Sequence, residues 1–478
     1  MKTLSVVAFS SLLLAGCVSA PSTIPSQMAL KAGNLGLDSS PGPHIDRQWW
    51  ESLNDPQLDA LIDKALADSP TLAGALARLH VAQSELSESR ADTYPQLSLD
   101  AQETRERFSK DYIIPPPYGG TTQWIGTTQA NLSWDIDFWG RQSAMVDKAR
   151  ASANAAALDA AAARLALAGA VTQAYVQLAS AYALRDVAAD AVKEREGVLG
   201  LTDTRLRNGL ENAAAQKQAQ ALLAQAKQAL TAAESDRDLA IHALAALAGR
   251  GADLYGQIVR PKLDLETGLT LPQTLPADLL ARRPDILAAQ ARIDAAVSGR
   301  EVARTAFYPD VNLMGLAGWA AIGLAPMLSA SSLNYGAGPA VHLPIFDAGK
   351  LRAEYAGATA ELDESVADYN NALVGAVKQT ADALTQSRSL EAQVRQQGNA
   401  LKAAQSGFQI AKTRYRNGLS PQTDVLVAED TLLTARRQQA LLDGDAAGAR
   451  ISLLLAVGGG FEAQAGSATQ AANQDKTP

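Results

Sequence analysis

The chain has 478 residues, of which 47% are hydrophobic, and its formal net charge is −8. A negative chain lacks the basic face that nucleic-acid binding needs, so no nucleic acid is expected as a partner. Aromatic residues make up only 5% of the chain, and no run of 18 or more apolar residues predicts a membrane-spanning helix. We therefore expect helices that pack closely through small side chains.

The N-terminus has the pattern of an export signal. Lys2 precedes a short apolar stretch from Leu4 to Ala15, which is too short to span a membrane. The residues Leu14-Ala15-Gly16-Cys17 follow, and they resemble a bacterial lipobox. This resemblance implies that residues 1–16 are a lipoprotein signal peptide and that Cys17 is lipidated. An ordinary signal peptide with an incidental Cys is the alternative.

Cys17 is the only Cys in the chain, which leaves no partner for an internal disulfide. The next residue is Val18 rather than Asp. Under the lipoprotein sorting rule this implies export to the outer membrane. Residues 17–44 contain several prolines and predict an irregular lipidated tether.

Two helices are predicted at the start of the folded part. Trp49-Trp50 and the leucines that follow indicate a short amphipathic helix. The two tryptophans either anchor at a membrane interface or pack against the long helices, and packing is the favoured interpretation. Pro70 then opens a helix that ends at Tyr94-Pro95.

Two long strands are predicted at about 95–108 and 122–138. From Thr122 to Phe138 the even positions are mainly apolar and the odd positions mainly polar, an alternation of period two. A strand of more than ~10 residues with such faces can cross a bilayer within a barrel. A soluble β-sandwich hairpin is the alternative, but it does not need strands of this length.

The pattern after Gly140 is helical to about Arg207, which corresponds to about 100 Å. Asn208-Gly209 then predicts a helix end and a turn. The returning helix to Ala248 corresponds to roughly 57 Å. We expect it to stack end to end with the helix that Pro70 opens, so that together they match the long helix.

The second half of the chain repeats this order. Thr204 to Leu210 resembles Thr413 to Leu419, and Tyr94-Pro95 recurs as Tyr308-Pro309. Self-similarity in the same order predicts a duplicated unit. The predicted domains and elements are a first repeat at 45–249 with its hairpin tip at 207–210, a linker at 250–276, a second repeat at 277–457 with strands at about 309–319 and 332–346 and a tip at 416–419, and a disordered tail at 458–478.

Four membrane-length strands cannot close a barrel alone, and an open edge in lipid leaves unpaired backbone groups. The chain is therefore expected to oligomerise. Two copies give a barrel that side chains fill, whereas three copies give twelve strands and a water-filled lumen. A trimer with long helices would form a duct from the outer membrane into the periplasm.

Several motifs carry a resemblance to a known family. The chain resembles the TolC-like outer-membrane factors of the NodT lipoprotein type over about residues 45–457. The motifs are Leu279-Leu280-Ala281-Arg282-Arg283-Pro284-Asp285-Ile286, Phe307-Tyr308-Pro309, Trp134-Asp135-Ile136-Asp137-Phe138-Trp139-Gly140-Arg141 and Leu343-Pro344-Ile345-Phe346-Asp347-Ala348-Gly349-Lys350.

The resemblance implies a mainly α fold with transmembrane β-strands. Four strands per chain would form a trimeric 12-stranded barrel, continued by a long periplasmic α-helical barrel. The implied partners are a periplasmic adaptor and an inner-membrane pump, commonly of the resistance-nodulation-division class. The implied cargo is small amphiphiles, and the exit duct of a type I protein or peptide secretion system is the alternative.

The resemblance also implies two sites. The helix-hairpin tips would dock the adaptor, through Arg207, Asn208, Gly209, Leu210, Arg416, Asn417, Gly418 and Leu419. The arginines at the tips also suit helix C-terminal dipoles. Asp424 matches an acidic gate position, whereas Val427 stands where the family has a second acid. One carboxylate ring instead of two puts strong cation selectivity in doubt, and Asp424 also suits a helix N-terminus.

Enzyme chemistry is not expected. His44, His80, His242 and His342 are scattered without ligand spacing, and no catalytic triad or phosphate loop stands out. No cofactor or metal is therefore expected. A lipid-anchored coiled-coil scaffold without a pore is the other non-enzyme reading, and the long alternation from Thr122 to Phe138 disfavours it.

Overall fold

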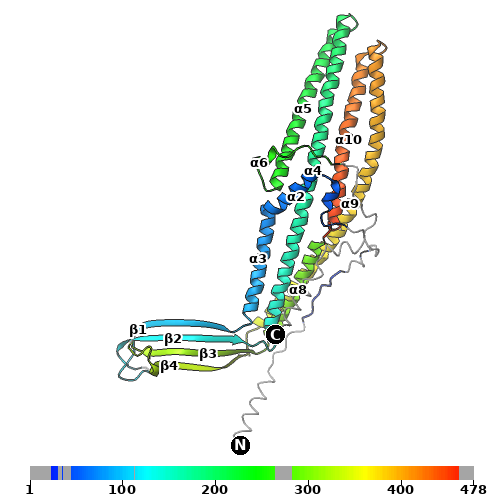
Figure 1. The fold of residues 1–478 in the computed structure, drawn as a ribbon. Coiled ribbons are helices and arrows are strands. Elements are labelled where there is room, and N and C mark those ends of the chain that lie inside the picture. Colours follow the sequence, from blue (N-terminus) through cyan, green and yellow to red (C-terminus); the bar gives the residue numbers. More distant parts are fainter. Residues whose placement is uncertain are drawn as a thin grey trace. The chain divides into compact units, whose positions relative to one another are not determined.

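The structure is a computed structural model that describes residues 23–30, 35, 45–111, 113–263, 283–323 and 325–461. The predicted signal peptide, Cys17 and residues 462–478 of the predicted tail lie outside the described residues. The elements (Figure 1) are η3 (Trp49–Leu53), α2 (Pro56–Asp68), α3 (Pro70–Ala91), β1 (Gln96–Arg107), β2 (Thr122–Asp135), α4 (Arg141–Arg207), α5 (Ala213–Leu247), α6 (Ala252–Tyr255), α8 (Pro284–Thr305), β3 (Asp310–Ile322), η4 (Ala330–Ser332), β4 (Leu333–His342), α9 (Lys350–Arg416) and α10 (Gln422–Ala456).

The chain forms two compact units. The sheet unit contains residues 1–29, 78–156 and 288–369, and the hairpin unit contains residues 30–77, 157–287 and 370–478. Each unit draws segments from both halves of the sequence. The long helices α4 and α9 contribute to both units.

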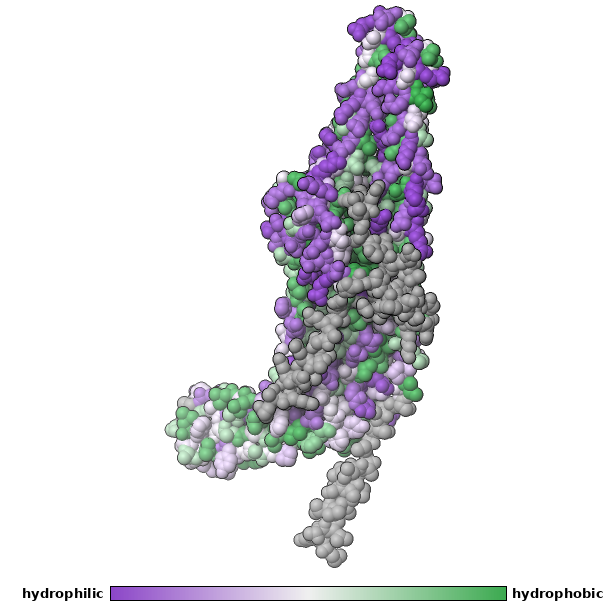
Figure 2. Space-filling model, turned by 45° about the vertical axis from the view of Figure 1, so that its right-hand side comes forward, coloured by the Kyte–Doolittle hydropathy of each residue, from purple (hydrophilic) through white to green (hydrophobic). Residues whose placement is uncertain are grey.

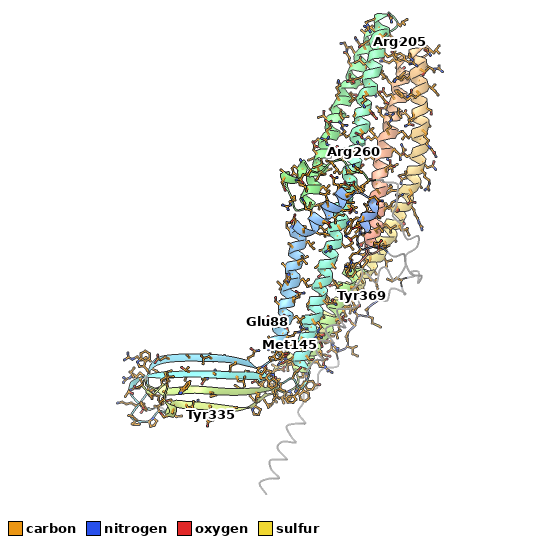
Figure 3. All side chains as sticks on the ribbon, viewed as in Figure 1. Glu88, Met145, Arg205, Arg260, Tyr335 and Tyr369 are labelled. Carbon is orange, nitrogen blue, oxygen red and sulfur yellow. The ribbon has the colours of Figure 1, made fainter. Side chains whose placement is uncertain are left out.

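The sheet unit is built on one four-stranded sheet with the order β1-β2-β3-β4, all antiparallel. Paired residues share a face, so the register aligns Leu99 with Ala130, Ala130 with Ala317 and Ala317 with Tyr335. These side chains lie on one apolar face, where Leu99 is 72% and Tyr335 76% exposed. Figure 2 shows hydrophobic side chains over the sheet, and Figure 3 labels Tyr335 on β4.

The opposite face of β1 and β2 is polar. Asn131 donates to the Asp100 carboxylate at 2.6 Å, and Asn312 of β3 bonds both Ser133 and Asp135. The alternation predicted for β2 is thus present as two chemically different faces. β3 departs from this pattern, because Met314 and Leu316 lie on the same face as Asn312.

The strand ends differ from the predicted ones by a few residues. β2 ends at Asp135 rather than at about 138, because Asp137 accepts the Ser143 N–H at the start of α4. β3 extends to Ile322, and β4 ends at His342. Among the described strands β4 pairs with β3 alone, and Pro339, which has no backbone N–H, stands opposite Leu313 in that pairing.

Two matching turns lead from the sheet into the long helices. Gly140 precedes α4 with φ 79° and Gly349 precedes α9 with φ 93°, a backbone conformation that favours glycine. Beside the first turn, Trp139 stacks on Tyr308 with ring centroids 5.2 Å apart and donates to the Pro309 carbonyl at 2.8 Å. The aromatic motifs therefore fix where strand gives way to helix.

The hairpin unit holds two helical hairpins of equal size. α4 and α9 each have 67 residues, and their partners α5 and α10 each have 35. By length and composition, α4 is the one described helix that could cross a membrane. Its Ala-rich stretch is apolar on average, although it contains no unbroken run of 18 apolar residues.

The core of the hairpin unit surrounds Tyr175 and Leu178 of α4. Trp49 and Trp50 belong to this core, with 3% and 5% of their surface exposed. The packing interpretation of these tryptophans is therefore confirmed. Asp55 is buried beside them, where it caps α2 and accepts hydrogen bonds from the Tyr175 hydroxyl at 2.7 Å and the Lys262 N–H at 2.8 Å.

The ends of the shorter helices are closed by arginines. Arg250, just after α5, pairs with Asp68 at the end of α2 at 2.6 Å. Arg283, just before α8, donates to the last-turn carbonyl of Ala456 in α10 at 2.9 Å and pairs with Asp285 at 2.7 Å. The Arg-Pro-Asp motif therefore joins one helix end to the next helix start.

Candidate functional site

Both predicted tips are tight turns that end a long helix. Gly209 has φ 70° and Gly418 has φ 73°. The Leu210 N–H reaches back to the Arg205 carbonyl at 2.8 Å, and the Leu419 N–H reaches the Arg414 carbonyl at 2.9 Å. This is the glycine-dependent closure of a helix C-terminus.

The predicted docking residues all lie on the surface of these turns. Leu210 is 63% and Leu419 68% exposed, and the arginines, asparagines and glycines of the two tips are exposed as well. An exposed leucine next to arginines offers a partner an apolar contact with a positive rim.

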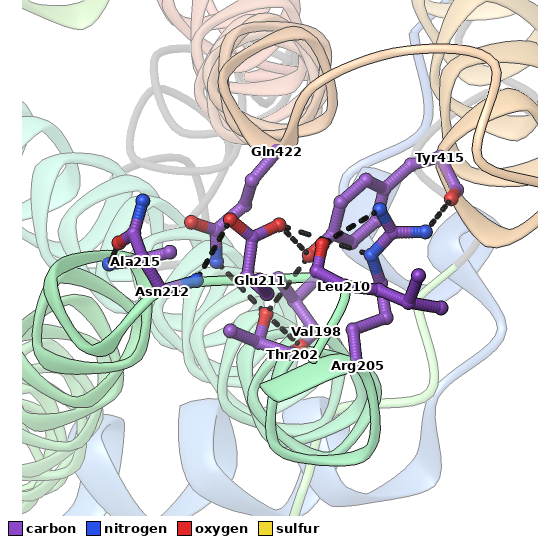
Figure 4. Close-up of polar contacts among 9 residues, drawn as sticks. All are labelled: Val198, Thr202, Arg205, Leu210, Glu211, Asn212, Ala215, Tyr415 and Gln422. Carbon is purple, nitrogen blue, oxygen red and sulfur yellow. Dashed lines mark hydrogen bonds and ion pairs between the residues drawn. The ribbon is translucent and has the colours of Figure 1, made fainter. Parts of the chain in front are cut away.

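A polar network beneath the tips joins the two hairpins (Figure 4). The Arg205 guanidinium of α4 lies 4.6 Å from the ring centroid of Tyr415 in α9 and donates to the Tyr415 carbonyl at 3.0 Å. The Tyr415 hydroxyl donates to Glu211 at 3.2 Å. Gln422 of α10 donates to the Thr202 hydroxyl at 2.9 Å, and that hydroxyl lies 3.4 Å from the Tyr415 hydroxyl.

The centre of this network is buried, whereas Arg205 and Glu211 at its edge are partly exposed. Tyr415 and Thr202 have no exposed surface and Gln422 is buried. Burial raises the pKa of the Tyr415 phenol above its ordinary value, so the hydroxyl stays protonated and able to donate near neutral pH. The network can therefore hold α9 and α10 against α4 and α5 at the tips.

Asp424, the predicted gate residue, lies in the first turn of α10 and is exposed. Val427, one turn further on, is 68% exposed. Residues three apart lie on the same face of a helix, so Asp424 and Val427 are exposed on one face of α10. Among the described residues, no group of His, Cys, Asp and Glu could hold a metal ion.

The sequence analysis did not predict the polar role of Tyr415. It also missed Thr202, Glu211 and Gln422. One signal was available: the repeat places Leu206 opposite Tyr415 in otherwise matching turns. A hydroxyl at only one of two equivalent positions marks where the two hairpins differ.

A family comparison decides the identity of the fold. The model of the family described as outer membrane efflux protein matches residues 61–250 and again 275–459. The chain belongs to this family. The double match falls on the two halves of the duplicated sequence, and the resemblance drawn from the motifs is confirmed.

Named relatives of this outer-membrane efflux protein export or confer resistance to small molecules. It is 35% identical to the fusaric acid resistance protein FusA of Burkholderia cepacia, over 73% of this chain and 68% of that one. It is 30% identical to the pyoverdine export outer membrane protein OpmQ of Pseudomonas aeruginosa, over 97% of this chain and 98% of that one.

Solved structures show the same fold. The outer membrane protein VceC of Vibrio cholerae matches with a TM-score of 0.81 and 35% identity, over 87% of this chain and all of that chain (100%). The Campylobacter jejuni CmeC outer membrane channel matches in fold with a TM-score of 0.84 at 22% identity, over 96% of this chain and 98% of that one. The chain is thus an efflux channel protein of the outer membrane. The predicted mainly helical fold with four strands per chain and the predicted outer-membrane location are confirmed.

Proposed function

We propose that three copies of the chain form the exit duct of a tripartite efflux system for small amphiphilic compounds. The observation that carries this proposal is the four-stranded sheet, on one face of which apolar residues are paired across all four strands. In the part of the chain that the structure describes, β1 and β4 each lack a second partner strand. Because lipid offers no hydrogen bonds to an open edge, β4 of one chain pairs with β1 of the next until the barrel closes.

The hairpin tips are the docking surface for a periplasmic adaptor. Their exposed leucine and arginine side chains point away from the buried network, which reaches Leu210 only through its backbone carbonyl, an acceptor for Arg205 at 3.3 Å. These side chains can therefore meet a partner without dismantling the fold. The adaptor links the duct to an inner-membrane pump of the resistance-nodulation-division type. Small-molecule cargo is favoured over protein cargo, because FusA is a fusaric acid resistance protein and OpmQ a pyoverdine export protein.

Lipidation of Cys17 anchors each chain in the outer membrane. Palmitate labelling of the wild type and of Cys17→Ser tests the anchor directly. Label on the wild type alone supports it, and equal labelling of both proteins contradicts it.

The duct assignment is tested by efflux in cells. The tip variant Leu210→Asp/Leu419→Asp places two carboxylates on the docking surface and should abolish export of a fluorescent amphiphile in cells that carry the chain with its pump and adaptor. Val259→Asp is the matched control, because Val259 is similarly exposed, at 58%, and lies outside the tips.

Export by the control and none by the tip variant, at equal amounts of folded protein, is the expected result. Unchanged export by the tip variant would contradict docking at the tips. Absence of export by the wild type itself would contradict the duct.

A further inference from the structure

Two ion pairs cross between α10 and α4 below the tips. The Glu429 carboxylate of α10 lies 3.0 Å from the Arg195 guanidinium of α4. The neighbouring residue Glu194 pairs with Arg436 of α10, also at 3.0 Å. The Glu194–Arg436 pair is partly exposed, whereas Glu429 has no exposed surface and Arg195 is 8% exposed. Glu429 has no role in the tip network described above.

The surroundings of Glu429 offer its ionised carboxylate little stabilisation. The 3.0 Å contact with Arg195 does not have the geometry of a hydrogen bond, and neither carboxylate oxygen accepts one from the described residues. A buried carboxylate needs several donors to offset the loss of water. The apolar cluster around it supplies none: Val425, Leu426 and Leu432 flank it on α10, with Phe408 of α9 and Val198 of α4 in the same cluster.

The charged groups near Glu429 do not cancel the rise in its pKa that burial causes. Loss of water raises the pKa of the Glu429 carboxyl to about 7. Arg195 opposes this rise, Glu194 adds to it, Lys412 of α9 opposes it and Asp430 adds to it. The carboxyl group thus changes its charge near neutral pH in the packed helices.

We propose that Glu429 is a proton-operated latch, which holds α10 against α4 when it is neutral and loosens that contact when it is ionised. The inference rests on the proposed function, in which these helix ends form the entrance of the duct. The periplasmic entrance would then close more firmly in acid and open more readily at higher pH.

The direction of the pH effect follows from the linkage between proton binding and helix packing. When α10 separates from α4, Glu429 meets water and its pKa returns toward the ordinary 4.5. The packed state therefore binds the proton more tightly, and its extra stability is fully present below pH 4.5 and is lost as the pH rises through about 7. One proton changes the equilibrium by at most about tenfold per pH unit.

A distance measurement on the whole protein tests the latch without requiring conduction. Spin labels at Lys193→Cys on α4 and Val427→Cys on α10 occupy exposed positions on the two helices. Labelled chains diluted with unlabelled ones in detergent should give a narrow distance distribution at pH 5.5 that broadens at pH 8.5.

Glu429→Gln copies the neutral carboxyl group, so its distribution should stay narrow at both pH values. Asp430→Asn is the matched control, because it removes an exposed carboxylate next to the site and should keep the pH response. Arg195→Met removes the cation that lowers the pKa of Glu429, so the pH at which the distance distribution broadens should rise. This variant tests the latch even if Glu429→Gln folds poorly.

A wild-type distance distribution that does not change with pH, or one that still broadens at pH 8.5 in Glu429→Gln, would overturn the latch. Conductance of the same preparations in planar bilayers separates the two proposals. A channel that conducts equally at both pH values contradicts only the latch, whereas absence of any channel contradicts the proposed duct.

Discussion

Arg283 shows how one side chain can join two helices. It donates to the Ala456 carbonyl at the end of α10, to Gln379 of α9 at 3.1 Å, and to Asp285 in the first turn of α8. Burial alone would raise the pKa of Asp285, but the guanidinium and the Ile286 N–H hold it below its ordinary value. The motif residues thus have a structural role that needs no ligand.

Arg283→Ala should lower the free energy of unfolding, because it leaves the Ala456 carbonyl with one donor fewer and Asp285 without its cation. Hydrogen bonds to charged groups contribute about 1.5–3 kcal/mol each. Arg90→Ala, at an exposed position in the last turn of α3, is the control and should change stability little. Urea unfolding followed by tryptophan fluorescence measures both variants.

The same motif gives a pH dependence. A carboxyl whose pKa is lowered on folding contributes stability that is present above its unfolded pKa and is lost as the pH falls through the folded value. The wild type should therefore lose more stability than Arg283→Ala when the pH falls from 6 to 3. Equal losses in the two proteins would contradict a role for the Arg283–Asp285 pair.

Asp424 is the residue on which the gate prediction depends. It is exposed in the first turn of α10, beside an exposed valine. We predict that Asp424→Ala raises the resting conductance of the duct in planar bilayers, because it removes the carboxylate ring at the constriction. Asp430→Ala should leave conductance unchanged, and no difference between the two variants would discard the gate.

At the scale of elements, the helices and turns followed from local patterns. Alanine-rich periodic stretches, Pro at helix starts and Asn-Gly at helix ends act within a few residues. The buried ion pair of Arg195 and Glu429 could not be predicted, because the partners are far apart in sequence and become neighbours only when α10 lies along α4. The residue at which β4 ends could not be predicted either, because it is set by pairing with β3, a separate strand.

The faces of the strands give an element-scale prediction. Leu99→Lys places a charge on the apolar face of β1 and should cost up to about 4 kcal/mol in a bilayer. Asp100→Lys, one residue further on, places the same charge on the polar face beside Asn131 and should cost much less. Unfolding of both variants in lipid vesicles compares them, and equal costs would mean that neither face meets lipid.

At the scale of the whole molecule, duplication accounts for the architecture. Two repeats supply two hairpins with helices of the same lengths and two strand pairs in one sheet. The number of copies that close the barrel cannot be read from one chain, because the bonds that close it lie between chains. Twelve strands from three copies leave room for a water-filled lumen, whereas eight strands from two copies do not.

The most direct test of the account is the protein mass of the particle extracted from outer membranes in mild detergent. We predict a mass of three chains, each of 50.0 kDa before processing. A stable monomer with native helix content would contradict the duct, because its four strands would leave both edges of the sheet unpaired. A dimer would contradict it as well, because its barrel would be filled by side chains.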